Sequence, residues 1–265
     1  MQSSGRWTKE QLKLAFYLYC QLPFGKLHRR NPEIIHLAQL IGRTPSAVAM
    51  KLVNFASLDP AIINTGRHGL GNASTLDHEI WDDFNSDWEK LAIECQYLRE
   101  GLESEQKVPH TGILDDYLGE FDLHDFTGET KRVVTEQRVK QSFFRRAVLS
   151  SYQGRCCMSG LSEPKLLVAS HIVPWSKDKI NRLNPRNGLC LSALHDKAFD
   201  YGFITLTNDL RILVSSEFIH GKDDFIKRVI LPLHGFEIIK PERFLPDVSF
   251  VAYHRQEIFL DNRKG

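Results

Sequence analysis

The sequence lacks the features of a membrane protein or of a disulfide-stabilised secreted protein. It has no uninterrupted apolar run of about 18 residues, the length that a transmembrane helix needs, and residues 1–7 lack the apolar core of a signal peptide. Its five cysteines are an odd number in 265 residues, which argues against a disulfide framework. The sequence contains no internal repeat and no low-complexity tract. We therefore expect a cytoplasmic globular chain, long enough for two compact domains.

The chain has almost no net charge, +1, but its charges are strongly segregated. Residues 1–60 carry eight Lys/Arg against three Asp/Glu, and residues 131–190 carry twelve against three. Between them, residues 101–130 carry one lysine against eight acids. Basic blocks favour a polyanionic partner, because phosphate contacts dominate the affinity of proteins for nucleic acids; solvated surface faces are the alternative. We interpret the acidic stretch as an interdomain linker.

Helical periodicity dominates residues 1–100 and predicts a helix-turn-helix-like domain. One helix is expected over residues 31–42 and the next over 47–55, joined by a short turn. We expect this segment to face DNA, with a structural helical hairpin as the alternative. The side chains expected to point outward to the DNA are Arg43, Ser46, Lys51 and Asn54. Further helices are predicted over 7–20, 76–98 and 133–152, and a hairpin over 203–207 and 211–215.

The stretch from 169 to 202 carries the residues best suited to chemistry. His171 follows a short apolar run that predicts a strand, Asn187 comes 16 residues later, and His195-Asp196 begins 8 residues after that. A histidine can take a proton from water near neutral pH, and one hard divalent cation can neutralise phosphoryl oxygens and assist the leaving alkoxide. This order suits a small metal-dependent phosphodiesterase. Asn187 is expected to bond a peptide group or the metal shell, and either His195 or Asp196 to reach the cation.

Several segments match a known pattern together: Phe144-Arg145, residues 152–160, 169–175, 184–189 and 195–200, with a tail over 245–259. In these segments the chain resembles the HNH endonuclease family, whose fold is a ββα-metal unit, and more narrowly a restriction-type subgroup. The resemblance implies that His171 is the general base, that Asn187 supports the active-site loop, and that the final motif position supplies a metal ligand. It further implies hydrolysis of DNA with one Mg²⁺ or Mn²⁺, 5′-phosphate and 3′-hydroxyl products, and a role in restriction or defence against foreign DNA.

The ligand set departs from the family pattern at its first position. Many members carry Asp or His directly before the first motif histidine, where this chain has Ser170. Counted from Asn187, Asp196 matches the final ligand position as well as His195 does, so both are expected near the metal. The candidate ligands are therefore Ser170, Asn187, His195 and Asp196. Asp200 is expected to cap or to pair with a basic residue such as Arg182 or Arg186. A structural zinc is not expected, because Cys156 is followed by Ser159 and a four-thiolate site is not available.

The sequence thus predicts an α+β protein: a helical, helix-turn-helix-like domain at 1–100, an acidic linker at 101–130 and an HNH nuclease domain at 131–265. DNA is the expected partner. The candidates for phosphate contact in the second domain are Arg145, Arg146, Lys177, Lys179, Arg182 and Arg186. A non-catalytic DNA-binding protein with a decayed site, and an RNA-directed or toxin-like nuclease, are the alternatives. The sequence leaves open a homodimer and a defence-system partner protein that activates the enzyme.

Overall fold

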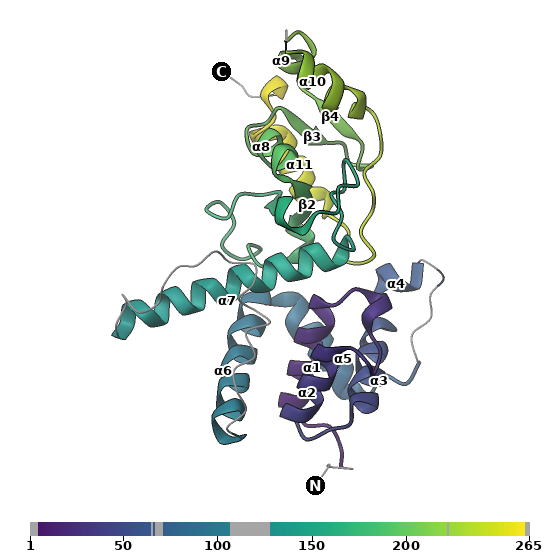
Figure 1. Ribbon diagram of the computed structural model, residues 1–265, viewed down its shortest axis with the longest axis vertical. Helices are drawn as coiled ribbons and strands as arrows, with labels where there is room; N and C mark the ends of the chain where they lie inside the picture. The colour runs from purple at the N-terminus through teal and green to yellow at the C-terminus, as the bar shows by residue number, and fades with distance from the viewer. Residues whose placement is uncertain (1–4, 65, 67–70, 107–127, 222, 263–265) are drawn as a thin grey trace. The chain divides into compact units, whose positions relative to one another are not determined.

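The computed structural model describes residues 5–64, 66, 71–106, 128–221 and 223–262 (Figure 1). Its contacts divide the chain into two compact units, residues 1–150 and 151–265. The first is helical and the second combines short hairpins with helices, which confirms the predicted α+β class. The helix at 128–151, expected to open the second domain, belongs almost entirely to the first unit. In the part of the chain that the structure describes, no helix is long and apolar enough to cross a membrane.

Local capping signals set the helix boundaries of the first unit. Thr8 and Gln11 form a capping box, and Asn31 and Thr44 each cap a helix that begins at a proline. The helices are α1 (Lys9–Gln21), η1 (Phe24–Lys26), α2 (Pro32–Leu40), α3 (Pro45–Ala56), α4 (Pro60–Asn64), α5 (Thr75–Ser86), α6 (Trp88–Gln106) and α7 (Gly128–Ser151). The helix predicted over 76–98 is two helices. Asp87 breaks it, since its carboxylate accepts from the Lys90 amide and starts α6.

The core of the first unit forms around Phe16 on α1, the helix that contacts α2, α3, α5 and α6. Its ring lies 5.1 Å from Phe55, 5.5 Å from Trp81 and 6.0 Å from Phe84, measured between ring centroids. Edge-to-face and offset contacts of this kind add to the burial of apolar area. The aromatic side chains of α5 therefore serve as core, as the sequence indicated.

The helix-turn-helix pair is present as α2 and α3, but its two expected cations do not point outward. Arg43 is 7% exposed and donates to the carbonyl oxygens of Gly5 and Arg6. Lys51 is 8% exposed, and its Nζ lies 2.9 Å from a carboxylate oxygen of Asp77. These expectations were wrong because each buried cation binds groups 26 to 38 residues away in the chain, which the helical pattern alone does not reveal. Ser46 is exposed, whereas Asn54 is half-buried and donates to the Asn72 carbonyl.

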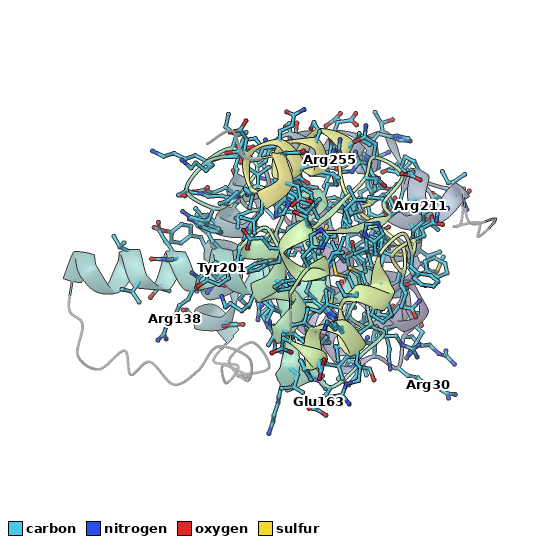
Figure 2. All side chains as sticks on the ribbon, turned by 90° about the horizontal axis from the view of Figure 1, so that it is seen from above. Arg30, Arg138, Glu163, Tyr201, Arg211 and Arg255 are labelled. Atoms are coloured by element: carbon cyan, nitrogen blue, oxygen red, sulfur yellow. The ribbon has the colours of Figure 1, made fainter. Side chains whose placement is uncertain are left out.

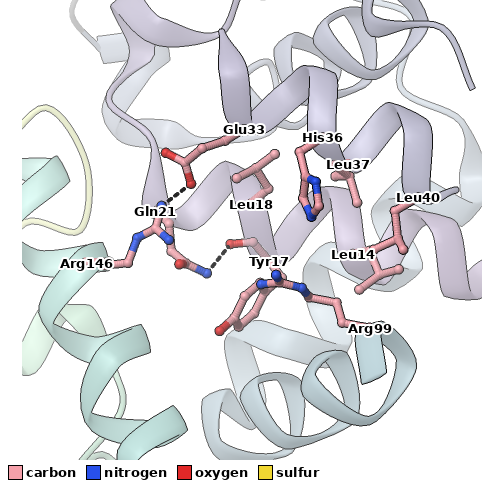
Figure 3. Close-up of a pocket in the computed structure, with 10 residues that line it drawn as sticks. All are labelled: Leu14, Tyr17, Leu18, Gln21, Glu33, His36, Leu37, Leu40, Arg99 and Arg146. Atoms are coloured by element: carbon pink, nitrogen blue, oxygen red, sulfur yellow. Dashed lines mark hydrogen bonds and ion pairs between the residues drawn. The ribbon is translucent and has the colours of Figure 1, made fainter. Parts of the chain in front are cut away.

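Two more expected DNA contacts lie on α7 and are partly covered. Arg145 and Arg146 are half-buried rather than exposed, and Arg146 is ion-paired with Glu33 of α2. Figure 3 shows this pair at the edge of a pocket floored by leucines of α1 and α2. The pocket encloses only about 50 Å³, far below the roughly 300 Å³ at which ligand sites begin. It is a packing defect between helices rather than a ligand site.

The second unit begins with an antiparallel pair of strands and continues with a helix. The pair β1 (Leu167–His171) and β2 (Gly188–Ser192) aligns His171 with Gly188. A second pair, β3 (Ile204–Leu206) and β4 (Ile212–Val214), confirms the predicted hairpin. The remaining elements are η3 (Pro164–Leu166), η4 (Pro185–Asn187), α8 (Ala193–Asp200), α9 (Ser216–Ile219), α10 (Asp224–Val229), η5 (Leu231–Leu233), α11 (Val248–Glu257) and η6 (Leu260–Asn262).

Candidate active site

The strands β1 and β2 and the helix α8 position the candidate residues. β2 runs directly into α8, because the Ser192 hydroxyl accepts from the His195 amide and caps the helix. Antiparallel pairing places Ser170 opposite Leu189 and His171 at the end of the ribbon. The long connection between the strands, residues 172–187, therefore starts and ends beside His171.

Asn187 closes this connection by pairing with backbone rather than with side chains. Its Oδ1 accepts from the Val173 amide at 2.7 Å, and its Nδ2 donates to the Val173 carbonyl at 3.1 Å. A longer contact, 3.4 Å, joins Nδ2 to the Asn181 carbonyl. The side chain is fully buried. Of the two roles expected for Asn187, the geometry matches peptide bonding, and the residue does not line the cavity beside His171.

His171 has a defined tautomer. Its Nε2 lies 2.9 Å from the Arg182 carbonyl oxygen, which can only accept, so Nε2 carries the proton and Nδ1 is the basic nitrogen. The Trp175 ring meets the imidazole edge-on, with centroids 5.5 Å apart. Burial lowers the pKa of His171 below its usual 6.5, while the Arg182 carbonyl and the charge of Asp200 oppose the shift. At neutral pH the ring is therefore uncharged and able to accept a proton.

A cavity of about 340 Å³ lies beside His171. Its lining includes two carboxylates, Asp196 and Asp200, which stand one turn apart on the same face of α8. Asp196 is 7% exposed, and burial raises its pKa, with the charge of Asp200 acting in the same direction. The nearby Ser170 hydroxyl lowers that pKa, although it forms no hydrogen bond of good geometry. The full lining comprises Val168, Ala169, Ser170, His171, Pro174, Trp175, Asp196, Asp200, His254 and Ile258.

His195 does not line this cavity, although the sequence placed it among the metal ligands. It is 3% exposed, and its Nδ1 lies 2.8 Å from Ser192 Oγ and 3.5 Å from Cys156 Sγ. Burial raises the pKa of Cys156, but hydrogen bonds from His195, Ser159 and nearby backbone amides outweigh it and bring the pKa to about 6. The structure thus brings Asp196, not His195, to the cavity, and His195 packs the start of α8.

The residues present fit a hard divalent cation better than zinc. Among the described residues no three His, Cys, Asp or Glu side chains form a ready metal cluster. Two carboxylates and a hydroxyl are nevertheless oxygen donors of the kind that Mg²⁺ and Mn²⁺ accept, with water completing the shell. The electrostatic coupling of Asp196 to Asp200 shows that two negative groups share this space. Over the ranges of the chain that the structure describes, only the exposed Lys197 lies within ion-pair distance of both carboxylates, at 3.8 Å from Asp196 and 3.4 Å from Asp200.

The connection between β1 and β2 carries the other cations expected to contact phosphate. Lys177, Lys179 and Arg186 are exposed. Arg182 is half-buried and stacks over the Trp175 ring, with its guanidinium carbon 5.0 Å from the ring centroid. Unlike Arg43, Lys51 and Arg146, the three exposed cations match the expectation from the sequence.

Sequence reasoning missed two residues of the cavity, Asp200 and His254. Asp200 was expected to cap or to pair with Arg182 or Arg186, yet its spacing of four from Asp196 could have indicated a shared helix face. His254 lies on α11, which the pattern of residues 218–254 did not reveal. The Asp247 side chain caps α11, so the Asp247 start signal was present in the sequence.

Comparison with known proteins agrees with this geometry. Residues 156–207 match a family model described as HNH endonuclease. A comparison with curated proteins gives no significant match. The matched range contains β1, β2, α8 and the cavity residues from Val168 to Asp200, so the strand–strand–helix arrangement and the family pattern coincide. The chain therefore carries an HNH endonuclease domain over residues 156–207, and such a domain indicates nuclease activity.

Proposed function

We propose that this chain is a metal-dependent endonuclease that hydrolyses DNA, with His171 as the general base. The observation that carries the proposal is the position of a neutral histidine and two carboxylates on one cavity. The Arg182 carbonyl holds the His171 proton on Nε2, so Nδ1 takes a proton from water. The water oxygen then bonds to phosphorus as the bond to the 3′ oxygen breaks, and the departing 3′ oxygen takes a proton from solvent, which yields 5′-phosphate and 3′-hydroxyl ends.

Asp196, Asp200 and the Ser170 hydroxyl are the groups that would hold the cation. A bound Mg²⁺ or Mn²⁺ supplies positive charge for the phosphoryl oxygen and for the leaving alkoxide. Asp200 takes the place that the sequence gave to His195 in this set. Ser170 in the first ligand position suggested a decayed site, but the carboxylate pair supplies the charge that a serine lacks.

Asn187 and the basic connection complete the proposed site. Asn187 fixes the connection through Val173, and this keeps the Arg182 carbonyl in place against His171. Lys177, Lys179, Arg182 and Arg186 contact the DNA backbone in this proposal, where each contact contributes to affinity but not to sequence preference. Cleavage of foreign DNA in restriction or defence is the biological role that we propose for this chemistry.

Plasmid cleavage by wild type, His171→Ala and His220→Ala tests the proposal. His220 is an exposed histidine of the same unit, so its replacement controls for loss of an imidazole. We expect wild type and His220→Ala to cleave with Mg²⁺ or Mn²⁺ and to stop with chelator, and His171→Ala to be inactive. Binding without cleavage by wild type would support the DNA-binding alternative, and preference for a matched RNA duplex would support the RNA-directed one.

Two further arms of the same assay address assembly. A single site that cuts both strands needs two copies, so nicked product at low protein concentration and linear product at high concentration would indicate a homodimer. Purified protein that is inert alone, but active with proteins encoded beside it, would indicate a defence-system partner.

A further inference from the structure

His254 of α11 reaches the last turn of α8, the helix that carries both carboxylates. Its Nε2 lies 3.1 Å from the Phe199 carbonyl oxygen, and its Nδ1 lies 2.8 Å from the Thr205 hydroxyl. The imidazole stacks on the Phe199 ring with centroids 3.6 Å apart. His254 is 1% exposed and borders the cavity together with Asp196 and Asp200.

Each hydrogen bond of His254 has one possible direction. A carbonyl oxygen only accepts, so Nε2 carries the proton and donates to Phe199. Nδ1 then accepts, and the Thr205 hydroxyl donates to it. The ring is satisfied on both sides in its neutral form, and its orientation is fixed from β3 and from α8 at once.

The segment after α11 also packs closely on the end of α8. Gly202, directly beyond α8, accepts from the Leu260 amide at 3.1 Å. A Cβ at Gly202 would lie only 2.1 Å from the Ile258 carbonyl oxygen, so the two backbones meet at a distance that only glycine allows. Residues 254–260 thus hold the C-terminal end of α8, just as Ser192 and Cys156 hold its start through His195.

The geometry points to His254 as a positioning residue of the nuclease site, which makes α11 part of the catalytic unit. This inference rests on the proposed function, because its consequence is the placement of Asp196 and Asp200 for a cation. α11 lies outside residues 156–207, the range that matches the family model. Residues 156–207 alone therefore lack the part of the cavity wall that His254 forms, and they lack the contacts by which residues 254–260 hold the end of α8.

Binding of Mn²⁺ to the full chain tests this role without relying on cleavage. The variants are His254→Phe, which keeps the stacked ring and loses both hydrogen bonds, and His254→Gln, which keeps a donor for the Phe199 carbonyl. His234→Phe is the matched control, since His234 in the same unit accepts from the Val214 amide away from α8. Mn²⁺ affinity is measured by electron paramagnetic resonance, DNA affinity is measured in chelator, and unfolding is followed by circular dichroism.

We expect His254→Phe to lose Mn²⁺ affinity by about tenfold or more, the range for outer residues that orient metal ligands. His254→Gln should recover most of that loss, and DNA affinity should not change. Unchanged Mn²⁺ affinity in a folded His254→Phe would overturn the inference, as would an equal loss in His234→Phe. If His254→Phe does not fold, His254→Gln and Thr205→Val are compared with wild type instead, because each of them removes only one of the two hydrogen bonds of His254. Failure of wild type to bind Mn²⁺ would overturn the proposed metal site and this inference together, whereas Mn²⁺ binding by wild type and equally by a folded His254→Phe would overturn only the inference.

A separate observation concerns the segment before α2, residues 25–30. It carries Lys26, His28, Arg29 and Arg30, all exposed. Within the described residues these four side chains have no acidic partner, unlike Lys51 on α3, which pairs with Asp77. Figure 2 shows Arg30 at the edge of the molecule with its side chain extended outward.

The backbone beneath these cations is well ordered by local contacts. Leu27 is 7% exposed and anchors the segment in the core. The Asn31 side chain donates to the Lys26 carbonyl at 3.0 Å, and the Asn31 amide donates to the His28 carbonyl at 2.9 Å. Four basic side chains are thus displayed from a fixed turn.

We infer that residues 26–30 form the phosphate-contacting surface of the helical unit, for the backbone of a nucleic-acid duplex. Unpaired, exposed cations on a fixed turn release counterions on binding without first breaking an ion pair. The surface lies before α2 rather than on α3, where Lys51 is paired with Asp77.

The salt dependence of duplex binding in chelator tests this surface independently of cleavage. Arg29→Gln/Arg30→Gln is compared with Lys9→Gln/Lys90→Gln, which removes two exposed lysines of the same unit that pair with Asp83 and Glu94. We expect the arginine variant to reduce the slope of log affinity against log salt by about 2, and the lysine variant to leave it nearly unchanged. Equal slopes for the two variants would overturn the inference.

Discussion

The close approach of Gly202 to Ile258 predicts a large cost for a single methyl group. Gly202 has φ +77°, where a side chain costs about 1–2 kcal/mol. Its Cβ would also lie 2.1 Å from the Ile258 carbonyl oxygen, 2.9 Å from its carbonyl carbon and 3.2 Å from the Phe259 Cα. All three are backbone atoms and cannot rotate away. Displacing them adds roughly 1–3 kcal/mol, so Gly202→Ala should lower the free energy of unfolding by about 2–5 kcal/mol in total.

Gly235→Ala provides a matched control within the same unit. Gly235 has φ +81°, but a Cβ there meets no atom within 4 Å. Its substitution should cost only the conformational part, about 1–2 kcal/mol. Hydrogen-exchange mass spectrometry measures the opening free energy in peptides from residues 193–206 and 230–240. Equal losses for the two variants would refute the reasoning, because the contact with α11 would then contribute nothing.

Three other predictions concern buried polar groups. Burial lowers the pKa of His254 from 6.5 to about 3, so the unfolded chain binds a proton that the folded chain excludes, and stability is lost as pH falls from 6.5 toward 3. From pH 7 to pH 5 this group should remove about 2 kcal/mol of the unfolding free energy, and His254→Gln should lack that part of the pH dependence; an unchanged slope would contradict this. Lys51→Met leaves the buried Asp77 carboxylate unpaired and should lower the free energy of unfolding, measured in urea, by about 3–5 kcal/mol. The double variant Lys51→Met/Asp77→Asn should recover part of this loss. No loss in Lys51→Met would mean that water reaches the carboxylate. Asn187→Ala leaves both backbone groups of Val173 unsatisfied and should cost roughly 2–4 kcal/mol and reduce cleavage, whereas unaltered activity would mean that the connection does not depend on this side chain.

Much of the second unit could be predicted because its signals are local. The apolar run before His171 and the turn at 208–209 each act within a few residues, and β1 and the second hairpin form where expected. In the first unit Asn31-Pro32 marks the start of α2 directly, whereas the turn expected before residue 47 is instead the first turn of α3, which Thr44 caps.

Residue environments set by distant parts of the chain could not be predicted in this way. Lys51 looks like an outward-facing cation until Asp77, 26 residues later, is placed beside it. His195 looks like a ligand until Cys156 is found 3.5 Å from its ring, which turns it toward the core. The spacing of Asp200 from Asp196 indicates a shared helix face, but only the packed structure places His171 on the same cavity. For Lys51 and His195 the deciding partner is fixed by tertiary packing, and periodicity carries no information about it.

The contact of α11 with α8 also sets an order in time. His254 lies 55 residues beyond Phe199 and 49 beyond Thr205, so a ribosome finishes His171, Asp196 and Asp200 well before it makes their last support. Closing such a long loop is slower than forming the strands and helix that precede it. Given the role inferred for α11, a nascent chain that ends before α11 contains His171, Asp196 and Asp200 but lacks the contacts that fix α8 beside the cavity. Activity of the proposed site then waits for the synthesis of α11, which comes well after the synthesis of its base and carboxylates.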